Sequence, residues 1–348
     1  MKVHVISETE YLVQGNGVHT AFVDHVELLK EQEDISVVVN EKGYGDVFHS
    51  HTYGPYYFWK GRHYKGRRVL TVHVIPDSIK GSIPIWQLWY PFVKWYFKQV
   101  YSYADVCIAI SPFVQKAIVE LKANTNILPI YNPIPLERWR RTEERRVIGR
   151  ERLRIQSNDF VVLGVGQLEK RKGVEDFIDI AAANPDVRFI WVGGRPFGAL
   201  TAGIRSINEL IKNASKNLTF TGLMELKDMP FVYAASDLFL FPSYQENCPL
   251  APLEAAASDI PVIFKDIEEY VSLYKSDYLK AKNNQEFIEF VKKMNCDKVF
   301  YKEGVSISRQ LVKQFDRTEI RTQLILLYQN LIQSAVNKSR FHLVSSKQ

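Results

Sequence analysis

Two glutamates, Glu246 and Glu254, lie in the polar segment after an apolar run, and both could bind a carbohydrate. The segment 241–263 reads FPSYQENCPLAPLEAAASDIPVI, with Glu246 in a loop and Glu254 near the start of the helix expected from Pro252. Their carboxylates can accept hydrogen bonds from sugar or ribose hydroxyls, and a helix N-terminus favours phosphate. An ordinary loop charge and a first-turn helix acid would explain the same pair, so the pattern needs support from the rest of the chain.

Two glycine-containing segments could hold the phosphates of such a ligand. The sequence GVGQLEKRKG sets Arg171 and Lys172 just after another apolar run. The sequence GNGVHTAF sets Gly15 and Gly17 where backbone N–H groups can approach an anion. A surface lysine and an ordinary turn would account for either segment taken alone.

Three histidines lie near the ends of apolar runs in the first half of the chain. His73 is part of TVHVIPDS, and His49 and His51 are part of HSHTYGP. No carboxylate stands at ligand spacing from them, and the chain has no Asp-x-Asp pair, so we expect no metal site. We interpret His49 and His51 as structural histidines.

Apolar runs that alternate with helical stretches must position these residues. One alternation covers the first third of the chain and a second begins at Phe160, each typical of a parallel, doubly wound sheet. We predict an α/β fold of two doubly wound, Rossmann-like domains facing a cleft, with the ligand at the carboxyl ends of the strands. The expected divisions are an N-terminal domain at 1–132, a linker at 133–159, a C-terminal domain at 160–317 and a C-terminal helix at 318–348 that packs back on the first domain.

The composition limits the class of protein. The chain has 348 residues, of which 46% are hydrophobic and 24% charged, as expected for a globular protein of two domains. Its three cysteines are far apart and no apolar run reaches eighteen residues, so we expect no disulfide framework, no transmembrane helix and a reducing cytoplasm. The first residues, MKVHVISETE, lack the apolar core of a secretory signal.

The net charge of +6 is concentrated in one part of the chain. Residues 42–141 hold 14 lysines and arginines against five acidic residues, which indicates an anionic partner or, more simply, a solvated surface. We expect no nucleic acid as partner. The arginine-rich run 138–154 carries no stacking aromatic residue beyond Trp139 and contains no recognisable nucleic-acid-binding module.

An aromatic segment, 83–103, holds nine aromatic residues in twenty-one. Apolar side chains recur in it at helical spacing, while Lys94 and Lys98 share another face. The recurring positions are Trp86, Trp89 or Tyr90, Val93, Phe97 and Val100. Amphipathic helices with tryptophan and lysine lie in the bilayer interface, so we predict a membrane or acceptor surface; a core helix with snorkelling lysines is the alternative. The residues assigned to this surface are Trp86, Trp89, Lys94, Trp95 and Lys98.

The glutamate pair resembles the glutamate–seven–glutamate signature of family 4 retaining glycosyltransferases, which have the GT-B fold. A Pro-Ser before Glu246, and the Ala-Ala and Pro-Val-Ile after Glu254, add to the likeness. The resemblance implies that Glu246 lies against the donor sugar as a catalytic residue and that Glu254 binds the nucleotide ribose. It also implies that His73 lies near the reacting centre, where a histidine steadies charge on the leaving phosphate.

Two further segments resemble the phosphate-binding parts of this family. GVGQLEKRKG is similar to a strand-end Gly-Arg followed by Lys-Gly, which implies that Lys172 clamps the diphosphate. Gln167 stands where arginine is usual, so part of the clamp is missing or is supplied by Arg171. GNGVHTAF resembles the loop that approaches the donor phosphates, which assigns that role to Gly15 and Gly17. Because GT-B enzymes generally do without a metal, the resemblance implies no cofactor beyond the nucleotide-sugar.

The chain length and the sequences GNGVHTAF, HTYGPYYF and VIPDSIKGS are similar to the glycolipid synthases of Gram-positive bacteria that build lipoteichoic-acid anchors. This resemblance implies retaining transfer of a hexose, glucose or galactose, from a UDP-sugar to diacylglycerol or monoglucosyl-diacylglycerol. It also implies a cytoplasmic protein bound peripherally to the anionic inner face of the cell membrane. One alternative is the same chemistry on a soluble acceptor. Another is an inactive protein that binds sugar nucleotides, because Gln167 departs from the family pattern.

Overall fold

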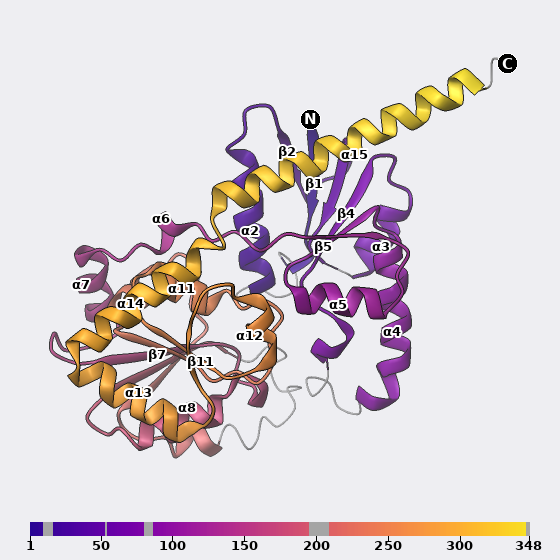
Figure 1. Ribbon diagram of the computed structural model, residues 1–348. Helices are drawn as coiled ribbons and strands as arrows, with labels where there is room; N and C mark the ends of the chain where they lie inside the picture. Colours follow the sequence, from indigo (N-terminus) through magenta and orange to yellow (C-terminus); the bar gives the residue numbers. More distant parts are fainter. Residues whose placement is uncertain (10–16, 53, 80–85, 195–208, 346–348) are drawn as a thin grey trace. The chain divides into compact units, whose positions relative to one another are not determined.

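In the computed structural model the chain divides into two compact units, each built around a six-stranded parallel sheet (Figure 1). The structure describes residues 1–9, 17–52, 54–79, 86–194 and 209–345. Unit 1 comprises Met1–Pro76, Trp89–Pro133 and Arg317–Gln348. Unit 2 comprises Asp77–Leu88 and Ile134–Asp316.

The sheet of unit 1 has the strand order β2-β1-β3-β4-β5-β6. Strands β3 and β5 are buried along their whole length, as short apolar runs are when helices cover both faces of a parallel sheet. The register sets Ser50 of β3 beside Leu70 of β4, so the residues that follow these strands leave the sheet at the same edge. The strands are β1 (Lys2–Ile6), β2 (Ser36–Val39), β3 (Val47–Ser50), β4 (Arg67–Val72), β5 (Val106–Ala109) and β6 (Asn126–Pro129).

Helices of unit 1 pack against this sheet, and the last of them comes from the C-terminal end of the chain. Ile320, Leu324 and Tyr328 of that helix, α15, share a buried core with residues of β1, β3, β4 and β5. Ser111 caps α5, because its side chain accepts a hydrogen bond from the backbone of Val114. The helices are α2 (Gly17–Lys30), α3 (Pro55–Arg62), α4 (Trp86–Ser102), α5 (Pro112–Glu120) and α15 (Arg317–Ser345). The first residues of α4 and most of a 3-10 turn, η1 (Pro76–Ile79), belong to unit 2.

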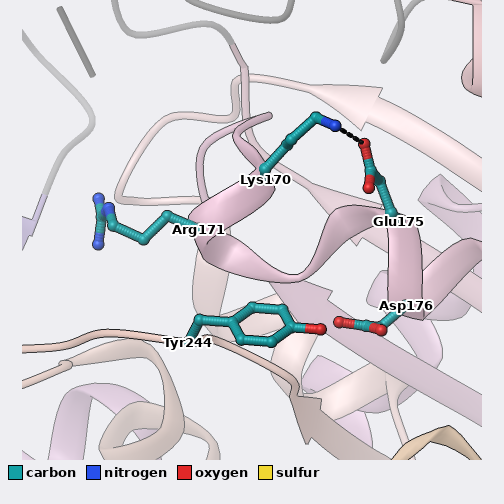
Figure 2. Close-up of a pocket in the computed structure, with 5 residues that line it drawn as sticks. All are labelled: Lys170, Arg171, Glu175, Asp176 and Tyr244. Carbon is teal, nitrogen blue, oxygen red and sulfur yellow. Dashed lines mark ion pairs between the residues drawn. The ribbon is translucent and has the colours of Figure 1, made fainter. Parts of the chain in front are cut away.

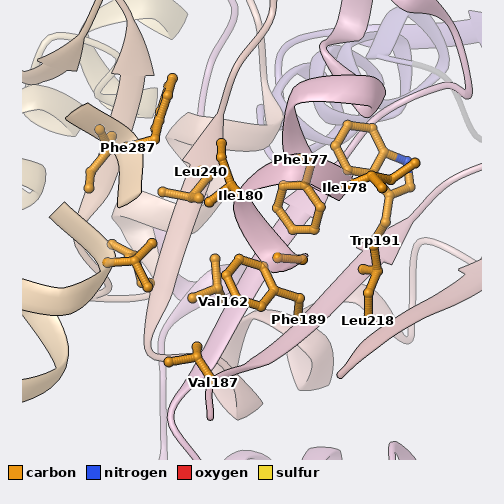
Figure 3. Packing of buried hydrophobic residues seen from close by; sticks show 14 of the residues in the cluster. Val162, Phe177, Ile178, Ile180, Val187, Phe189, Trp191, Leu218, Leu240 and Phe287 are labelled. Carbon is orange, nitrogen blue, oxygen red and sulfur yellow. The ribbon is translucent and has the colours of Figure 1, made fainter. Parts of the chain in front are cut away.

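The sheet of unit 2 has the order β12-β11-β10-β7-β8-β9 and is also parallel throughout. Its core is aromatic where α8 lies on β8. Phe177 meets Phe189 and Trp191 with ring centroids 5.5 and 5.1 Å apart (Figure 3). The strands are β7 (Val161–Val165), β8 (Arg188–Val192), β9 (Leu218–Gly222), β10 (Leu238–Phe241), β11 (Val262–Lys265) and β12 (Leu279–Ala281).

The arginine-rich stretch that the sequence suggested as a linker contains two helices, and both pack in unit 2. Thr142 caps the second of them by accepting a hydrogen bond from the backbone of Arg145. The helices of unit 2 are α6 (Leu136–Trp139), α7 (Glu143–Arg152), α8 (Val174–Ala182), α10 (Met229–Ala235), α11 (Ala251–Ala257), α12 (Glu268–Leu273), α13 (Asn284–Cys296) and α14 (Lys298–Lys313), with a 3-10 turn, η2, at Lys170–Lys172.

The predicted fold class, α/β with two doubly wound parallel sheets, is confirmed. Helices separate most consecutive strands in both sheets, as the apolar runs indicated, although β2 is followed directly by β3. Among the described residues, no helix is both long and apolar enough to cross a membrane.

Candidate functional site

The turn after β7 brings Lys172 against the loop that follows β10. Gly173 ends this turn with φ of 71°, in the left-handed region. A Cβ at this position would lie 2.3 Å from the carbonyl oxygen of Pro242, so only glycine allows the two loops to come so close. The approach of these two backbones forms the candidate donor site of unit 2.

Glu246 receives two short hydrogen bonds in this place. Lys172 Nζ and Ser243 Oγ each donate to Glu246 Oε1 at 2.6 Å. The Glu246 side chain is 7% exposed and that of Lys172 is 17% exposed, so the ion pair is largely sheltered from water. Ser243 was not among the predicted residues, although it lies only three positions before Glu246.

The surroundings keep this pair charged. Burial by itself raises the pKa of the Glu246 carboxyl, but Lys172, Arg171 and the hydroxyl of Ser243 outweigh it and hold that pKa below its usual value. Burial also lowers the pKa of Lys172, against the attraction of Glu246. At 2.6 Å a charge-assisted bond dominates, so we treat the two groups as a carboxylate and an ammonium at neutral pH.

Arg171 lies beside the pair but is engaged elsewhere. Its guanidinium donates to the carbonyl oxygen of Gln245 at 3.1 Å and to a carboxylate oxygen of Glu169 at 3.2 Å. Gln167 is half-buried just after β7. The sequence suggested Arg171 as the substitute for the arginine that is usual at position 167, and the structure gives it a role in joining the two loops.

A small polar pocket of about 320 Å³ lies next to this network. Figure 2 shows Tyr244 with its hydroxyl toward Asp176, and Lys170 paired with Glu175 at 3.2 Å. Tyr244 is 52% exposed, and partial burial together with a hydrogen bond from its hydroxyl to Asp176 raises its pKa to about 12, so this phenol remains protonated. The pocket is lined by Lys170, Arg171, Glu175, Asp176 and Tyr244.

Glu254 lies in the first turn of α11 and is fixed by a residue that the sequence did not indicate. Tyr233 of α10 donates its hydroxyl to Glu254 Oε2 at 2.6 Å. Both side chains are buried, and the ring of Trp139 packs against Tyr233 edge-on at 5.5 Å. A carboxylate can accept several hydrogen bonds at once, which is the property that binding of ribose hydroxyls would use.

Unit 1 contains a buried cluster of histidines near the carboxyl ends of β3 and β4. His51 Nδ1 and His73 Nε2 are hydrogen-bonded at 3.0 Å. His49 is hydrogen-bonded through Nδ1 to Tyr328 of α15 at 2.5 Å and through Nε2 to Thr71 at 2.7 Å. The interpretation of His49 as a structural histidine therefore has direct support from its partners.

Burial keeps these histidines neutral. It lowers the pKa of His73 to about 3 and, with a contribution from His73, that of His25 in α2 to about 3. His25 is hydrogen-bonded through Nε2 to Tyr328 at 3.1 Å. Nitrogen atoms of His25, His49 and His51 lie within 4.8 Å of one another, which a metal ion could bridge. Because hydrogen bonds already engage both nitrogens of His49 and one of His51, the arrangement favours a hydrogen-bonded cluster.

The glycines of the predicted phosphate loop are placed only in part. Gly15 lies outside the described residues. Gly17 is the first residue of α2, and a Cβ there would meet nothing within 4 Å. The role of both glycines toward the donor phosphates therefore stays a prediction.

Helix α4 has two apolar faces. The predicted stripe faces inward, since Phe97 and Val100 are buried and Trp86, Tyr90 and Val93 are half-buried. The stripe position that the sequence left open between Trp89 and Tyr90 belongs to Tyr90, because Tyr90 is half-buried and Trp89 is exposed. An opposite set is exposed to solvent to between 56% and 77% and consists of Leu88, Trp89, Phe92 and Trp95. Lys94 and Lys98 are exposed as well.

Both interpretations of this segment thus apply to one helix, on opposite faces. The core interpretation holds for the stripe that the sequence pattern selected, including Trp86. Trp89, Trp95 and the two lysines face solvent, and their assignment to a membrane or acceptor surface stays a prediction. Large exposed rings on one helix are unusual for a monomer surface and typical of a contact surface.

Two family models match the chain. One, described as glycosyl transferases group 1, matches residues 147–302, and one described as glycosyltransferase family 4 matches residues 41–138. A relative from Streptococcus pneumoniae, alpha-galactosylglucosyldiacylglycerol synthase, is 30% identical over 92% of this chain and 87% of its own length. The processive diacylglycerol alpha-glucosyltransferase of Acholeplasma laidlawii is 28% identical over 84% of this chain and 88% of its own length.

Solved structures share the fold over nearly the whole chain. HepE of Anabaena in complex with UDP-glucose has a TM-score of 0.75 at 17% identity, over 95% of this chain and all of that one. Sucrose-phosphate synthase from Thermosynechococcus elongatus has a TM-score of 0.77 at 17% identity, over 96% of this chain and all of that one. The match covers both sheets of the chain, so the GT-B fold that the sequence predicted is confirmed.

Proposed function

Because this chain belongs to the glycosyltransferases, with one part matching the group 1 model and another the family 4 model, we propose that it transfers a hexose from a UDP-sugar to a diacylglycerol-type lipid acceptor with retention of configuration. The buried Lys172–Glu246 pair at the ends of β7 and β10 is the structural observation that carries the proposal. The two sequence relatives, whose names refer to diacylglycerol lipids, support the acceptor class. The solved structure of HepE, which has the same fold and is in complex with UDP-glucose, supports the donor.

The reaction breaks the bond between the anomeric carbon and the β-phosphate oxygen. The acceptor oxygen forms its bond to that carbon on the same face, and the acceptor proton leaves with the departing phosphate. Positive charge develops on the sugar and negative charge on UDP, so fixed charges near each of them lower the barrier. The protein needs no covalent intermediate for this sequence.

Each residue of the donor site takes one part in this scheme. Lys172 neutralises the diphosphate, and Arg171 supports it while holding the two loops together. Glu246 accepts hydrogen bonds from the hexose hydroxyls, and Glu254, fixed by Tyr233, accepts them from the ribose. His73 donates a hydrogen bond at the reacting centre. Gly15 and Gly17 offer backbone N–H groups to the phosphates, and Gln167 fills the position next to them.

The acceptor is a membrane lipid, and we assign its surface to the outward face of α4. Leu88, Trp89, Phe92 and Trp95 enter the headgroup region, and Lys94 and Lys98 meet anionic lipid. The protein then lies peripherally on the cytoplasmic face of the cell membrane. Trp86 lies at the start of the same helix and supports it from the inner side.

Transfer from labelled UDP-glucose and UDP-galactose to diacylglycerol and glucosyl-diacylglycerol tests the proposal. We expect a labelled, chloroform-soluble product from one donor, formed equally well in EDTA because lysine and arginine neutralise the charge of the diphosphate.

Product only with soluble sugars would favour the same chemistry on another acceptor. Donor binding without any transfer would indicate an inactive sugar-nucleotide-binding protein, and restoration of lost activity by manganese or magnesium would overturn the metal-free site.

A further inference from the structure

The ring of His51 lies in hydrogen-bonding contact with the ring of His73, which the proposed function places at the reacting centre. His51 follows β3 and His73 follows β4, two neighbouring strands that end at the same edge of the sheet. The two side chains are 2% and 7% exposed, and His51 Nδ1 lies 3.0 Å from His73 Nε2. A hydrogen bond between two buried imidazoles constrains the proton position on both.

One proton must lie between the two nitrogens. Burial lowers the pKa of both side chains, so each ring is neutral and has one N–H donor and one bare nitrogen acceptor. Either His51 donates from Nδ1, or His73 donates from Nε2. In the first arrangement the single N–H of His73 lies on Nδ1, and in the second the single N–H of His51 lies on Nε2.

The second nitrogen of His51 decides between them. Among the described residues, His51 Nε2 is buried and has no hydrogen-bond partner. If His51 accepted at Nδ1, its own proton would lie on Nε2 as a buried N–H without an acceptor. Orphaned buried N–H donors are rare and costly, more so than a bare acceptor. The favoured arrangement therefore has the proton of His51 on Nδ1 and the proton of His73 on Nδ1.

The neighbours of His51 hold its ring in place. His25 packs against it edge-on at 4.5 Å, and His49 stacks on it at 4.9 Å. His49 is itself fixed by Thr71 and by Tyr328 of α15. The orientation of the His51 donor is thus set by β3, β4, α2 and the C-terminal helix together.

We propose that His51 is a positioning residue for the transfer reaction: its Nδ1–H holds His73 in the tautomer whose Nδ1 carries the proton. The proposal rests on the role of His73 in the proposed function. With Nε2 occupied as an acceptor, His73 serves the reacting centre as a fixed N–H donor and not as a general base. A donor aimed at developing negative charge accelerates the step without changing how tightly the ground state binds.

Two variants at His51 separate this role from a structural one. His51→Phe removes the donor and keeps a ring in the cluster, while His51→Asn keeps an N–H close to the position of Nδ1. We expect His51→Phe to lower kcat roughly 10- to 100-fold, somewhat less than the roughly 10²- to 10³-fold cost of deleting such a donor. KM for the UDP-hexose should stay within about twofold, and His51→Asn should recover most of kcat. His4→Phe, which alters a buried histidine of β1 in the same sheet, is the matched control and should leave kcat unchanged.

The tautomer itself is read without turnover, by nitrogen-15 NMR of the histidine side chains. In the wild type the His73 signals should show Nδ1 protonated and Nε2 bare, and in folded His51→Phe this pattern should be lost or mixed. An Nε2-protonated His73 in the wild type would overturn the inference, as would equal kcat in the wild type and both His51 variants. If no acceptor is glycosylated at all, the proposed function is wrong. The NMR measurement still tests the proton position on His73, because it does not depend on catalytic activity.

Discussion

The bond between Lys172 and Glu246 joins residues that lie 74 positions apart in the chain. Each residue was predicted as part of a motif, and neither motif contained the other. A sequence pattern reports residue types and spacing, so it cannot show that Lys172 and Glu246 form an ion pair with each other. Tyr233 was not predicted and His51 was interpreted only as a structural histidine, because the partners of both residues lie on other elements.

Replacing Lys172 should weaken donor binding. Lys172→Ala removes a charge-assisted contact to the diphosphate, which costs about 1.5–3 kcal/mol, or roughly ten- to a hundredfold in UDP affinity. Lys170→Ala is the matched control two residues away, because its side chain is 61% exposed and pairs with Glu175 at the surface. Calorimetric titration of UDP should show the loss in the first variant and not in the second. Equal affinity in both would show that Lys172 does not bind the donor.

The buried histidines should make the fold sensitive to mild acid. His25 and His73 have pKa values of about 3 in the folded chain against an ordinary value of 6.5, so below pH 6.5 the unfolded chain binds more protons. The free energy of unfolding should fall as the pH drops from 6.5 toward 3, by at most about 1.4 kcal/mol per pH unit for each histidine.

Urea unfolding at several values between pH 7 and pH 5 measures this slope above the range in which most carboxylates titrate. His25→Leu should flatten it, and substitution of the exposed His63 by alanine should not. A slope that His25→Leu leaves unaltered would mean that His25 is not buried as a neutral ring.

At the scale of elements, α7 shows what the arginine-rich stretch does. Arg146 and Arg150 reach the carboxylate of Asp237 at 2.8 Å each, and Arg141 lies 3.6 Å from it. The side chain of Asp237 is 11% exposed and also accepts a hydrogen bond from the backbone of Val161 at the start of β7. The arginines that suggested a linker fasten α7 to the sheet of unit 2. Composition alone could not separate a linker from a helix whose charges are paired.

Loss of the Asp237 charge should therefore destabilise unit 2. Asp237→Asn leaves partly buried guanidinium groups without their common carboxylate, and breaking such a buried pair costs about 3–5 kcal/mol. Asp228→Asn is the control, since Asp228 pairs with Arg152 at side-chain exposures of 33% and 52%, where a pair contributes under about 1 kcal/mol. Chemical denaturation followed by tryptophan fluorescence should separate the two variants. Similar midpoints for both would show that the buried cluster carries little stability.

Helix α4 gives the membrane prediction its test. Trp89→Ser with Trp95→Ser should reduce binding to phosphatidylglycerol vesicles at every salt concentration, because both rings are exposed and contribute apolar area. Lys94→Glu with Lys98→Glu should act mainly at low salt, since each basic residue near an anionic surface contributes about 1 kcal/mol that salt screens.

The matched control for this surface is Val119→Ser, which alters an exposed apolar residue of α5. All variants should still bind UDP and unfold cooperatively. If the double tryptophan variant folds and binds vesicles as well as the wild type, α4 is not the membrane-binding surface. The helical period of the sequence predicted an apolar stripe, but such a stripe fits a core as well as a surface, and only the packing assigned each face.

At the scale of the whole molecule, local pattern predicted most of the fold. Each sheet follows from apolar runs that alternate with helices, because parallel strands need a crossover between them. The pairing order within each sheet, and the packing of Tyr328 against histidines near the other end of the sequence, depend on contacts that no local pattern contains. The family resemblance predicted the donor-site residues, and only the structure identified the residues to which they are hydrogen-bonded.

The central claim is retaining transfer of a hexose to a diacylglycerol-type lipid. The anomeric configuration of the lipid product tests it most directly, because UDP-glucose and UDP-galactose carry α-linked sugars. Proton NMR of the purified product should show an α-linked hexose on the glycerol or on the first sugar, with the small anomeric coupling of that linkage. A β-linked product would contradict retention, and the absence of any glycosylated lipid from both donors would contradict the account as a whole.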